Sequence, residues 1–321
     1  MSLLSIKDLN ISFTLTEGSV HAVNNVSFDI EAGQKLALVG ESGSGKSQIA
    51  FSILQLLAKN GTATGEVMFE GENLLTASQR HLNKIRSNDI SIIFQDPMSS
   101  LNPYMRIERQ LSEVLELHQG LNSRDARKRV LEVLDAVRIP DAKNRLRQYP
   151  HEFSGGMRQR LVIAMALLCK PKLILADEPT TALDVTVQAQ IMALLDEIQR
   201  DSGTAIMLIT HDLGVVAGFC DETVVLYGGR VMERAKTTDL FDRPTHPYTK
   251  GLLHAIPNIE DKDATLSAIP GSPPNASQFP TQCPFAPRCE LAIDACHSQL
   301  PELTTTAPHR ACIRPIEDVT P

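Results

Sequence analysis

The sequence predicts an α/β fold with a mostly parallel β-sheet, and two features support this prediction. Short apolar runs of the strand type alternate along the chain with longer stretches whose apolar residues fall at three- and four-residue spacing. Such alternation is typical of a parallel sheet covered by helices on both faces. In addition, a glycine-rich segment at residues 40–47 stands between an apolar run and a helical stretch. The order of strand, turn and helix is the one that a phosphate-binding loop requires.

The composition is that of an ordinary globular protein. The 321 residues suffice for a full α/β core and a further module. A net charge of −7 argues against nucleic acid as the main partner. The longest apolar run, Leu161 to Cys169, is about half of a membrane-spanning helix, and residues 1–6 lack the pattern of a signal peptide. We therefore expect any membrane role to come through a partner.

The first ninety residues predict strands around one helix. Leu3 to Ile30 alternates apolar and polar residues around a turn at residues 17–19, which predicts an N-terminal antiparallel β subdomain. The spacing of Ser47 to Leu57 predicts a helix. Further strands are expected at residues 66–69 and 90–94.

The middle of the chain predicts a helical subdomain inserted into the α/β core, at about residues 100–165. From Asn102 to Tyr149 apolar residues mark helical faces, with many charges between them. Strand-like runs then return, separated by helical stretches such as Val187 to Arg200; these runs are residues 173–176, 205–209 and 223–226.

After about Leu240 proline becomes frequent and the periodicity ends, so long helices are not expected there. We therefore divide the chain into a nucleotide-binding domain, residues 1–240, and a loop-rich C-terminal extension, residues 241–321.

The glycine-rich segment fits the pattern G-x-x-x-x-G-K-[ST]. Its residues that would contact nucleotide are Gly40, Ser42, Gly43, Ser44, Gly45, Lys46 and Ser47. The glycines let backbone N–H groups turn inward around phosphates, Lys46 can reach the terminal phosphates, and Ser47 can place its hydroxyl on Mg²⁺. The bare pattern also arises by chance as a glycine-rich turn, but the flanking strand and helix favour binding of a nucleoside triphosphate.

Two adjacent carboxylates, Asp177 and Glu178, follow the apolar run at residues 173–176. At the carboxyl edge of a parallel sheet they would face the phosphate-binding loop. Asp177 can then hold the Mg²⁺ shell while Glu178 polarises the attacking water. Without that loop, we would interpret the two acids as caps of the next helix.

A second anion site is predicted at Ser154, Gly155 and Gly156, which precede a strong helix. Ser154 can act as the N-cap, and the two glycines leave backbone amides bare. One chain has no obvious need of two phosphate sites, but two chains facing head to tail would each close the other's nucleotide. An ordinary capped helix is the alternative for this segment alone.

Together these residues resemble the ATP-binding-cassette ATPases over roughly Leu3 to Met232. Residues 154–156 match the family signature, with Phe153 and Met157 departing from the usual L-S-G-G-Q, and Asp177-Glu178 matches Walker B. The resemblance implies further roles: Gln95 as the Q-loop residue near Mg²⁺ and water, residues 182–184 as the D-loop, His211 as the switch histidine, and Phe13 as the aromatic that stacks on adenine. It also implies a P-loop NTPase core of the RecA-like type.

Two of these residues have ordinary structural alternatives when taken alone. A histidine after an apolar strand, as His211 is, is more often structural than catalytic, and an aromatic residue near a strand end, as Phe13 is, most often belongs to the core.

The C-terminal segments at residues 245–253 and 269–274 resemble the ATPase subunits of bacterial oligopeptide and dipeptide importers. The resemblance implies ATP-driven uptake of peptides, from the cytoplasmic face of the inner membrane. It implies three kinds of partner: a second, related ATPase, a pair of integral membrane permease subunits, and a periplasmic peptide-binding protein that feeds them.

Cys283, Cys289, Cys296 and Cys312 gather in the proline-rich tail with the spacing C-x5-C-x6-C-x15-C. In a chain without a secretory signal they indicate a metal site, and the spacing is not the paired C-x2-C of zinc ribbons. The resemblance to peptide-importer ATPases implies a [4Fe–4S] cluster here. Zn²⁺ and unliganded thiols are the alternatives.

Two other functions fit the sequence less well. Soluble cassette ATPases of translation or DNA repair usually carry two cassettes or a long coiled coil, and this sequence has neither. A regulatory module with an inactive nucleotide site is disfavoured because Lys46, Asp177, Glu178 and His211 are all present.

Overall fold

The structure is a computed structural model that describes residues 2–181, 183–256, 269–274, 277 and 281–320. It divides into two units, each with its own internal contacts. The first comprises Met1–Ile30, Lys35–Thr76 and Ile209–Pro321, and the second comprises Glu31–Gln34 and Ala77–Leu208.

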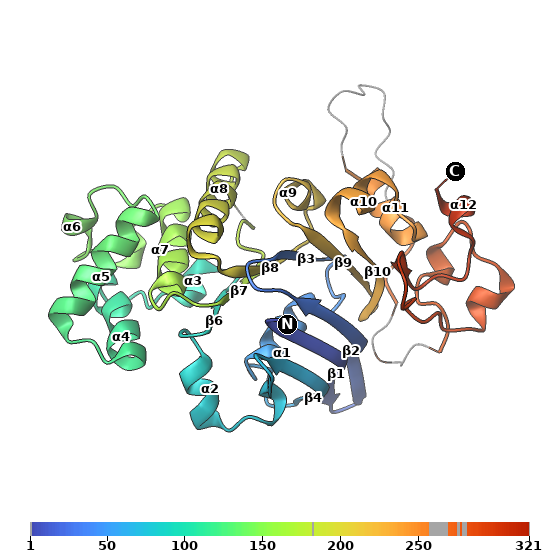
Figure 1. Cartoon of the computed structure of the whole chain (residues 1–321), viewed down its shortest axis with the longest axis horizontal. Coiled ribbons are helices and arrows are strands. Elements are labelled where there is room, and N and C mark those ends of the chain that lie inside the picture. Colours follow the sequence, from blue (N-terminus) through green and yellow to red (C-terminus); the bar gives the residue numbers. More distant parts are fainter. Residues whose placement is uncertain (1, 182, 257–268, 275–276, 278–280, 321) are drawn as a thin grey trace. The chain divides into compact units, whose positions relative to one another are not determined.

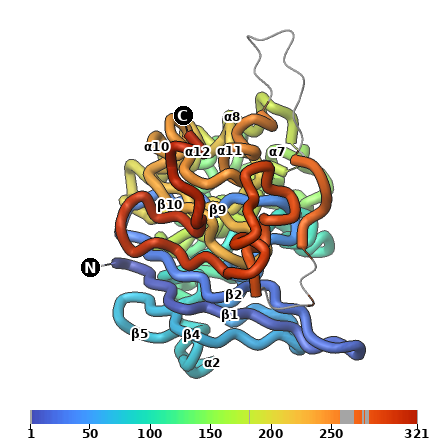
Figure 2. The backbone as a smooth tube through the Cα atoms, turned by 90° about the vertical axis from the view of Figure 1, so that its right-hand side faces the viewer, coloured from blue at the N-terminus to red at the C-terminus, as the bar shows by residue number. Residues whose placement is uncertain are grey.

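The predicted N-terminal antiparallel sheet is confirmed in the first unit (Figures 1 and 2). Its strands follow the order β2-β1-β4-β5 and comprise β1 (Leu4–Leu15), β2 (Gly18–Ile30), β4 (Gly61–Phe69) and β5 (Glu72–Asn73). Alternating side chains of β1, such as Leu4 and Ile6, are fully buried, as a sheet with one covered face requires.

The first unit also contains a mixed sheet. The apolar strand β3 (Lys35–Val39) runs parallel to β9 (Glu222–Tyr227), while β10 (Arg230–Lys236) returns antiparallel to β9. A short strand from the tail, β11 (His309–Arg310), adds to β10. In Figure 2 this C-terminal chain, coloured red, runs beside β10. Because β10 runs antiparallel to both β9 and β11, the sheet of this unit is not purely parallel.

The helices of the first unit are short. They are α1 (Lys46–Ile53), η1 (Leu74–Thr76), α9 (Leu213–Ala217), α10 (Thr237–Asp242), α11 (Pro247–His254), η3 (Ala286–Arg288), η4 (Asp294–His297) and α12 (Ile316–Val319). α1 is shorter than the predicted helix, and Gln55, just beyond its end, has a φ of 49°, outside the helical region. The absence of long helices in the described tail agrees with its prolines.

Aromatic packing joins the C-terminal extension to β9 within this unit. Tyr227 from the end of β9 lies 4.6 Å from Tyr248 and 5.3 Å from Phe285, measured between ring centroids. The carboxylate of Glu233 on β10 is 1% exposed and accepts hydrogen bonds from Thr245 and from the backbone N–H of His246. The start of α11 is thus held by both β9 and β10.

The second unit carries the predicted helices. Its parallel strands are β6 (Ile90–Ile93) and β7 (Leu173–Asp177). Its helices are α2 (Gln79–Ile85), α3 (Pro97–Ser100), α4 (Ile107–Gln119), α5 (Ser123–Ala136), α6 (Ala142–Arg145), η2 (Pro150–Glu152), α7 (Gly155–Leu167) and α8 (Val185–Ser202). The strand β8 (Ala205–Thr210) begins in this unit and ends in the first. Among the described residues, no helix has the length and apolar character needed to cross a membrane.

Candidate nucleotide site

The glycine-rich segment forms a tight turn between β3 and α1, as predicted. A Cβ on Gly40, where φ is 152°, would lie 2.1 Å from the Leu226 carbonyl oxygen. A Cβ on Gly45, where φ is 96°, would lie 2.3 Å from the Ala22 carbonyl oxygen. Real atoms cannot approach so closely, so both positions require glycine. Leu226 and Ala22 thereby set the path of the loop.

Lys46 folds back over this loop. Its Nζ donates hydrogen bonds to the carbonyl oxygens of Gly40 at 2.8 Å and of Glu41 at 2.9 Å. The residue is only 6% exposed. Ser47 follows in the first turn of α1, which has no acidic side chain to repel an anion. A helix start with a left-handed glycine and a buried lysine fits the phosphates of a nucleotide.

The two carboxylates lie at the end of β7, in the second unit. Asp177 is the last residue of the strand and is 4% exposed. The next residue, Glu178, has a φ of 46°, an uncommon value for a residue with a side chain. Such backbone values concentrate at functional sites.

The structure brings Gln95 and Glu178 together. The Gln95 Nε2 donates a hydrogen bond to the Glu178 Oε2 at 2.7 Å, and the Thr181 Oγ1 donates to the same oxygen at 2.8 Å. Thr181 was not among the predicted site residues. The oxygen-bearing side chains of Asp177 and Gln95 are ligands of the type that Mg²⁺ prefers.

Ser154 caps α7 as predicted. Its Oγ accepts a hydrogen bond from the backbone N–H of Met157 at 3.4 Å. A Cβ on Gly155 would meet no atom within 4 Å, whereas a Cβ on Gly156 would lie 2.8 Å from the Val187 Cγ1 on α8. Gly155 therefore leaves open space over the helix start, and Gly156 permits close packing of α7 and α8.

These two glycines give a matched test of that packing. We expect Gly156→Ala to lower the free energy of unfolding by about 1–3 kcal/mol, because the new methyl group overpacks against Val187. Gly155→Ala should leave it unchanged or raise it by up to about 1 kcal/mol, because alanine favours the helix. Denaturant unfolding of the two variants measures the difference. The packing account is wrong if Gly155→Ala is the more destabilising change.

The remaining predicted residues lie in the first unit. His211 is exposed directly after β8, and the next residue, Asp212, caps α9. Phe13 on β1 is half-buried, and its ring covers Gly61 of β4, where a Cβ would lie 2.7 Å from the Phe13 Cε1. Their roles toward a nucleotide stay predictions.

The predicted site residues therefore fall in both units. Phe13, the phosphate-binding loop and His211 belong to the first unit; Gln95, residues 154–156 and Asp177-Glu178 belong to the second.

The predicted metal cluster at the four tail cysteines is wrong. Cys283, Cys289, Cys296 and Cys312 do line one small cavity. Among the residues that the structure describes, however, no group of three or more His, Cys, Asp or Glu side chains could hold a metal ion. Burial raises the pKa of Cys283 to about 11 and also raises the pKa values of Cys289 and Cys312, which favours neutral thiols. The four cysteines do lie near one another in the fold. The spacing along the chain, however, cannot show whether their sulfur atoms are arranged to bind a metal.

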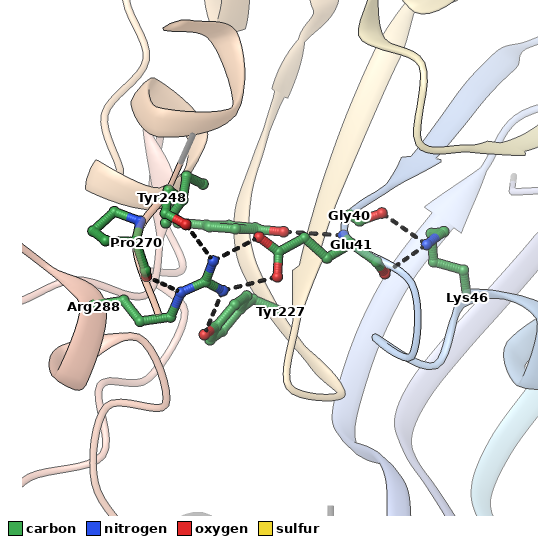
Figure 3. Close-up of polar contacts among 8 residues, drawn as sticks. Gly40, Glu41, Lys46, Tyr227, Tyr248, Pro270 and Arg288 are labelled. Atoms are coloured by element: carbon green, nitrogen blue, oxygen red, sulfur yellow. Dashed lines mark hydrogen bonds and ion pairs between the residues drawn. The ribbon is translucent and has the colours of Figure 1, made fainter. Parts of the chain in front are cut away.

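Sequence reasoning also missed a contact that reaches the loop from the C-terminal extension. The Arg288 guanidinium forms an ion pair with Glu41, the second residue of the glycine-rich segment, at 2.8 Å (Figure 3). The two residues are 247 positions apart, and no periodicity or motif connects them.

Comparison with known families matches two parts of the chain. Residues 23–181 match the ABC transporter family, and residues 232–296 match the family described as the oligopeptide/dipeptide transporter, C-terminal region.

Relatives match almost the whole chain. The oligopeptide transport ATP-binding protein OppD of Salmonella typhimurium is 53% identical over 99% of this chain and 95% of its own. OppD of Haemophilus influenzae is 55% identical over 94% of both chains. The dipeptide transport ATP-binding protein DppD of Bacillus subtilis is 48% identical over 94% of this chain and 90% of its own.

Solved structures of cassettes share the fold. A dimeric ATP-binding cassette in a post-hydrolysis state, bound to ADP and phosphate, superimposes with a TM-score of 0.65 at 30% identity and covers 73% of this chain and 98% of its own. CbiO1 of Clostridium perfringens, part of an ABC transporter complex, gives a TM-score of 0.65 at 28% identity, over 75% of this chain and 91% of its own.

Proposed function

This chain belongs to the ABC transporter ATPases that carry an oligopeptide/dipeptide-type C-terminal region, and on that premise we propose that it powers the uptake of oligopeptides or dipeptides across a bacterial inner membrane. As a member of the family it is an ATPase, and ATP with Mg²⁺ fits that family. The observation that carries the proposal is the match to peptide-transport ATP-binding proteins along almost the full chain, the C-terminal region included.

We assign the phosphates to the loop between β3 and α1. Lys46 would exchange its carbonyl partners for phosphate oxygens, which are stronger acceptors for an ammonium group. The Ser47 hydroxyl, with Asp177 and Gln95, would hold Mg²⁺, which neutralises charge on the phosphates when bound. Phe13 would stack on adenine with the part of its ring that Gly61 leaves uncovered.

Hydrolysis is assigned to Glu178. Hydrogen bonds from Gln95 and Thr181 to one carboxylate oxygen fix the side chain, and a carboxylate held in this way can orient a water. His211 would contact the γ-phosphate. Gln95 stands just ahead of α3 and beside Glu178, which suits a relay between hydrolysis and the membrane subunits.

We propose that two ATPase chains act together. Ser154, Gly155 and Gly156 would bind the ATP held by the phosphate-binding loop of a second, related ATPase, and ATP binding would shift the pair toward a closed state. The open space above Gly155 supports a phosphate at this helix start.

Changing Ser154 to alanine should therefore impair hydrolysis of the ATP bound to the partner's loop. Nucleotide crosslinking to each chain, followed by measurement of turnover at each site, checks this. The head-to-tail arrangement is wrong if the substitution affects only the ATP held by Lys46 of the same chain. Ser202→Ala is a matched control, since Ser202 ends α8 and its hydroxyl bonds within that turn.

We propose that the chain consists of two consecutive domains. Residues 1–240 form the nucleotide-binding domain, with a helical subdomain at about residues 100–165 that includes α4, α5 and most of α7. Residues 241–321 form the extension. The family match at residues 232–296 supports a boundary in this region.

The proposed location is the cytoplasmic face of the inner membrane, as a peripheral subunit of a complex with two integral permease subunits. A periplasmic peptide-binding protein would deliver the peptide to them. Purification of the native complex tests this: we expect integral membrane subunits and a second ATPase to accompany the chain. Association with ribosomes or DNA instead would overturn the transport assignment in favour of a soluble ATPase.

A further inference from the structure

Arg288 is the most heavily bonded side chain in the described part of the C-terminal extension. It ends η3, and its side chain is 6% exposed. Its Nε donates to the Pro270 carbonyl at 2.8 Å, and its Nη2 donates to the Ile269 carbonyl at 3.1 Å. These bonds come from the extension itself and hold the guanidinium in one orientation (Figure 3).

The other side of this guanidinium faces the phosphate-binding loop. Its Nη1 lies 2.8 Å from the Glu41 Oε2, and its Nη2 lies 3.1 Å from the Glu41 Oε1. This is a bidentate pair, a geometry that only arginine can form with a carboxylate. The Nη1 also donates to the Tyr227 hydroxyl at 3.1 Å, so the fork is aligned by β9 as well.

Glu41 is held at its backbone too. Its N–H donates to the Tyr248 hydroxyl at 3.1 Å, and its carbonyl accepts from Lys46 at 2.9 Å. Tyr248 is fully buried. This one residue of the loop therefore contacts Lys46 of the same loop on one side and two residues of the extension, Tyr248 and Arg288, on the other (Figure 3).

Such a contact matters because a glycine-rich loop has more conformational freedom to lose on ordering than other segments. Gly40, Gly43 and Gly45 each have φ between 81° and 152°, and glycine retains the most freedom in an unrestrained chain. A loop that is ordered only on binding lowers affinity by the entropy of ordering it, whereas a loop ordered in advance does not.

We infer that Arg288 and Tyr248 are positioning residues that preorganise the phosphate-binding loop through Glu41, so that the affinity of this chain for ATP depends on its C-terminal extension. The inference rests on the proposed placement of ATP at this loop. It makes the extension a part of the nucleotide site, in addition to any contact that it has with partners.

The test is equilibrium binding of MgATP to the full chain, with Arg288→Lys and Tyr248→Phe as the variants. Arg288→Lys keeps the charge but loses the fork, and Tyr248→Phe keeps the ring packing but loses the hydroxyl. We expect Arg288→Lys to raise the Kd for ATP about tenfold, the ratio that corresponds to one charge-assisted hydrogen bond, and Tyr248→Phe to raise it about 2- to 10-fold, the ratio that corresponds to one neutral hydrogen bond. In steady-state turnover the KM should rise while kcat at saturating ATP stays within about twofold.

Arg234→Lys is the matched control. Arg234 forms a similar bidentate pair with Glu222, at 2.8 and 3.2 Å, in the same unit. Glu222 stands beside Leu36 at the start of β3, whereas the loop follows the end of that strand. We expect this variant to keep the parent Kd.

ATP binding by a double variant of Glu41 and Arg288 gives a second measurement. Because Glu41 and Arg288 act as one pair, Glu41→Gln combined with Arg288→Lys should weaken ATP binding no further than the stronger single change. If Arg288→Lys fails to fold, Tyr248→Phe carries the test alone.

The inference is overturned if Arg288→Lys and Tyr248→Phe bind ATP as the parent and Arg234→Lys do, or if they lower kcat with an unchanged KM. A parent chain that binds no ATP, or whose ATP binding is unaffected by Lys46→Ala, contradicts the proposed nucleotide site instead. The two failures are therefore distinguishable.

Discussion

Replacing Glu178 by glutamine is expected to remove most ATP turnover at this chain's own site while leaving ATP binding nearly intact. A glutamine can still accept the hydrogen bonds from Gln95 and Thr181, so the local geometry survives. It cannot act as a base toward water, and loss of a general base lowers the rate by about 10²–10⁴-fold. Phosphate release and equilibrium ATP binding, measured on the same preparation, check both parts.

The glutamine variant should also accumulate in an ATP-bound, closed pair of ATPase chains, because closure no longer ends in hydrolysis. Glu197→Gln is a suitable control, since Glu197 lies on α8 and forms an exposed ion pair with Arg138. Full ATPase activity of Glu178→Gln, in a complex where this is the only competent site, would refute the assignment.

Lys46→Ala is expected to act at an earlier step, by weakening nucleotide binding itself. The change removes a cation that would face the phosphates, and it also removes the two bonds that hold the carbonyls of Gly40 and Glu41. Loss of a charge-assisted hydrogen bond to a phosphate corresponds to about 1.5–3 kcal/mol, or roughly a 10- to 150-fold higher Kd. Calorimetric titration with MgATP measures it.

The two variants are expected to differ in what they impair: Lys46→Ala weakens ATP binding, whereas Glu178→Gln lowers turnover. Lys172→Ala serves as the control for Lys46→Ala, because Lys172 pairs with Asp89 at a partly exposed position. An unchanged Kd for Lys46→Ala would show that the loop between β3 and α1 does not hold the phosphates of ATP.

Most of the local structure could be predicted from the sequence because its causes are local. The apolar run before Gly40 is β3, the runs at residues 173–176 and 223–226 are parts of β7 and β9, and Ser154 caps α7. Side-chain periodicity, turn residues and capping act over a few residues, so they can be recognised without knowing what each element packs against.

The contacts between distant segments could not be predicted in this way. The cysteine spacing correctly indicated proximity, since the four thiols line one cavity, but it wrongly indicated a metal site. The pairing of β11 with β10 joins a two-residue strand to a partner about 75 positions earlier, and two residues are too few for a pattern.

By itself, the sequence determined the order of strands and helices, the glycine-rich turn between β3 and α1 and the family to which the chain belongs. These follow from residue types at fixed short spacing, and motifs of that kind can be recognised without knowing the rest of the fold. Only the tertiary structure decided that Arg288 and Tyr248 contact Glu41, and that Gln95 donates to an oxygen of Glu178. The physical reason is that a hydrogen bond between residues far apart in the chain depends on the packing of every element between them.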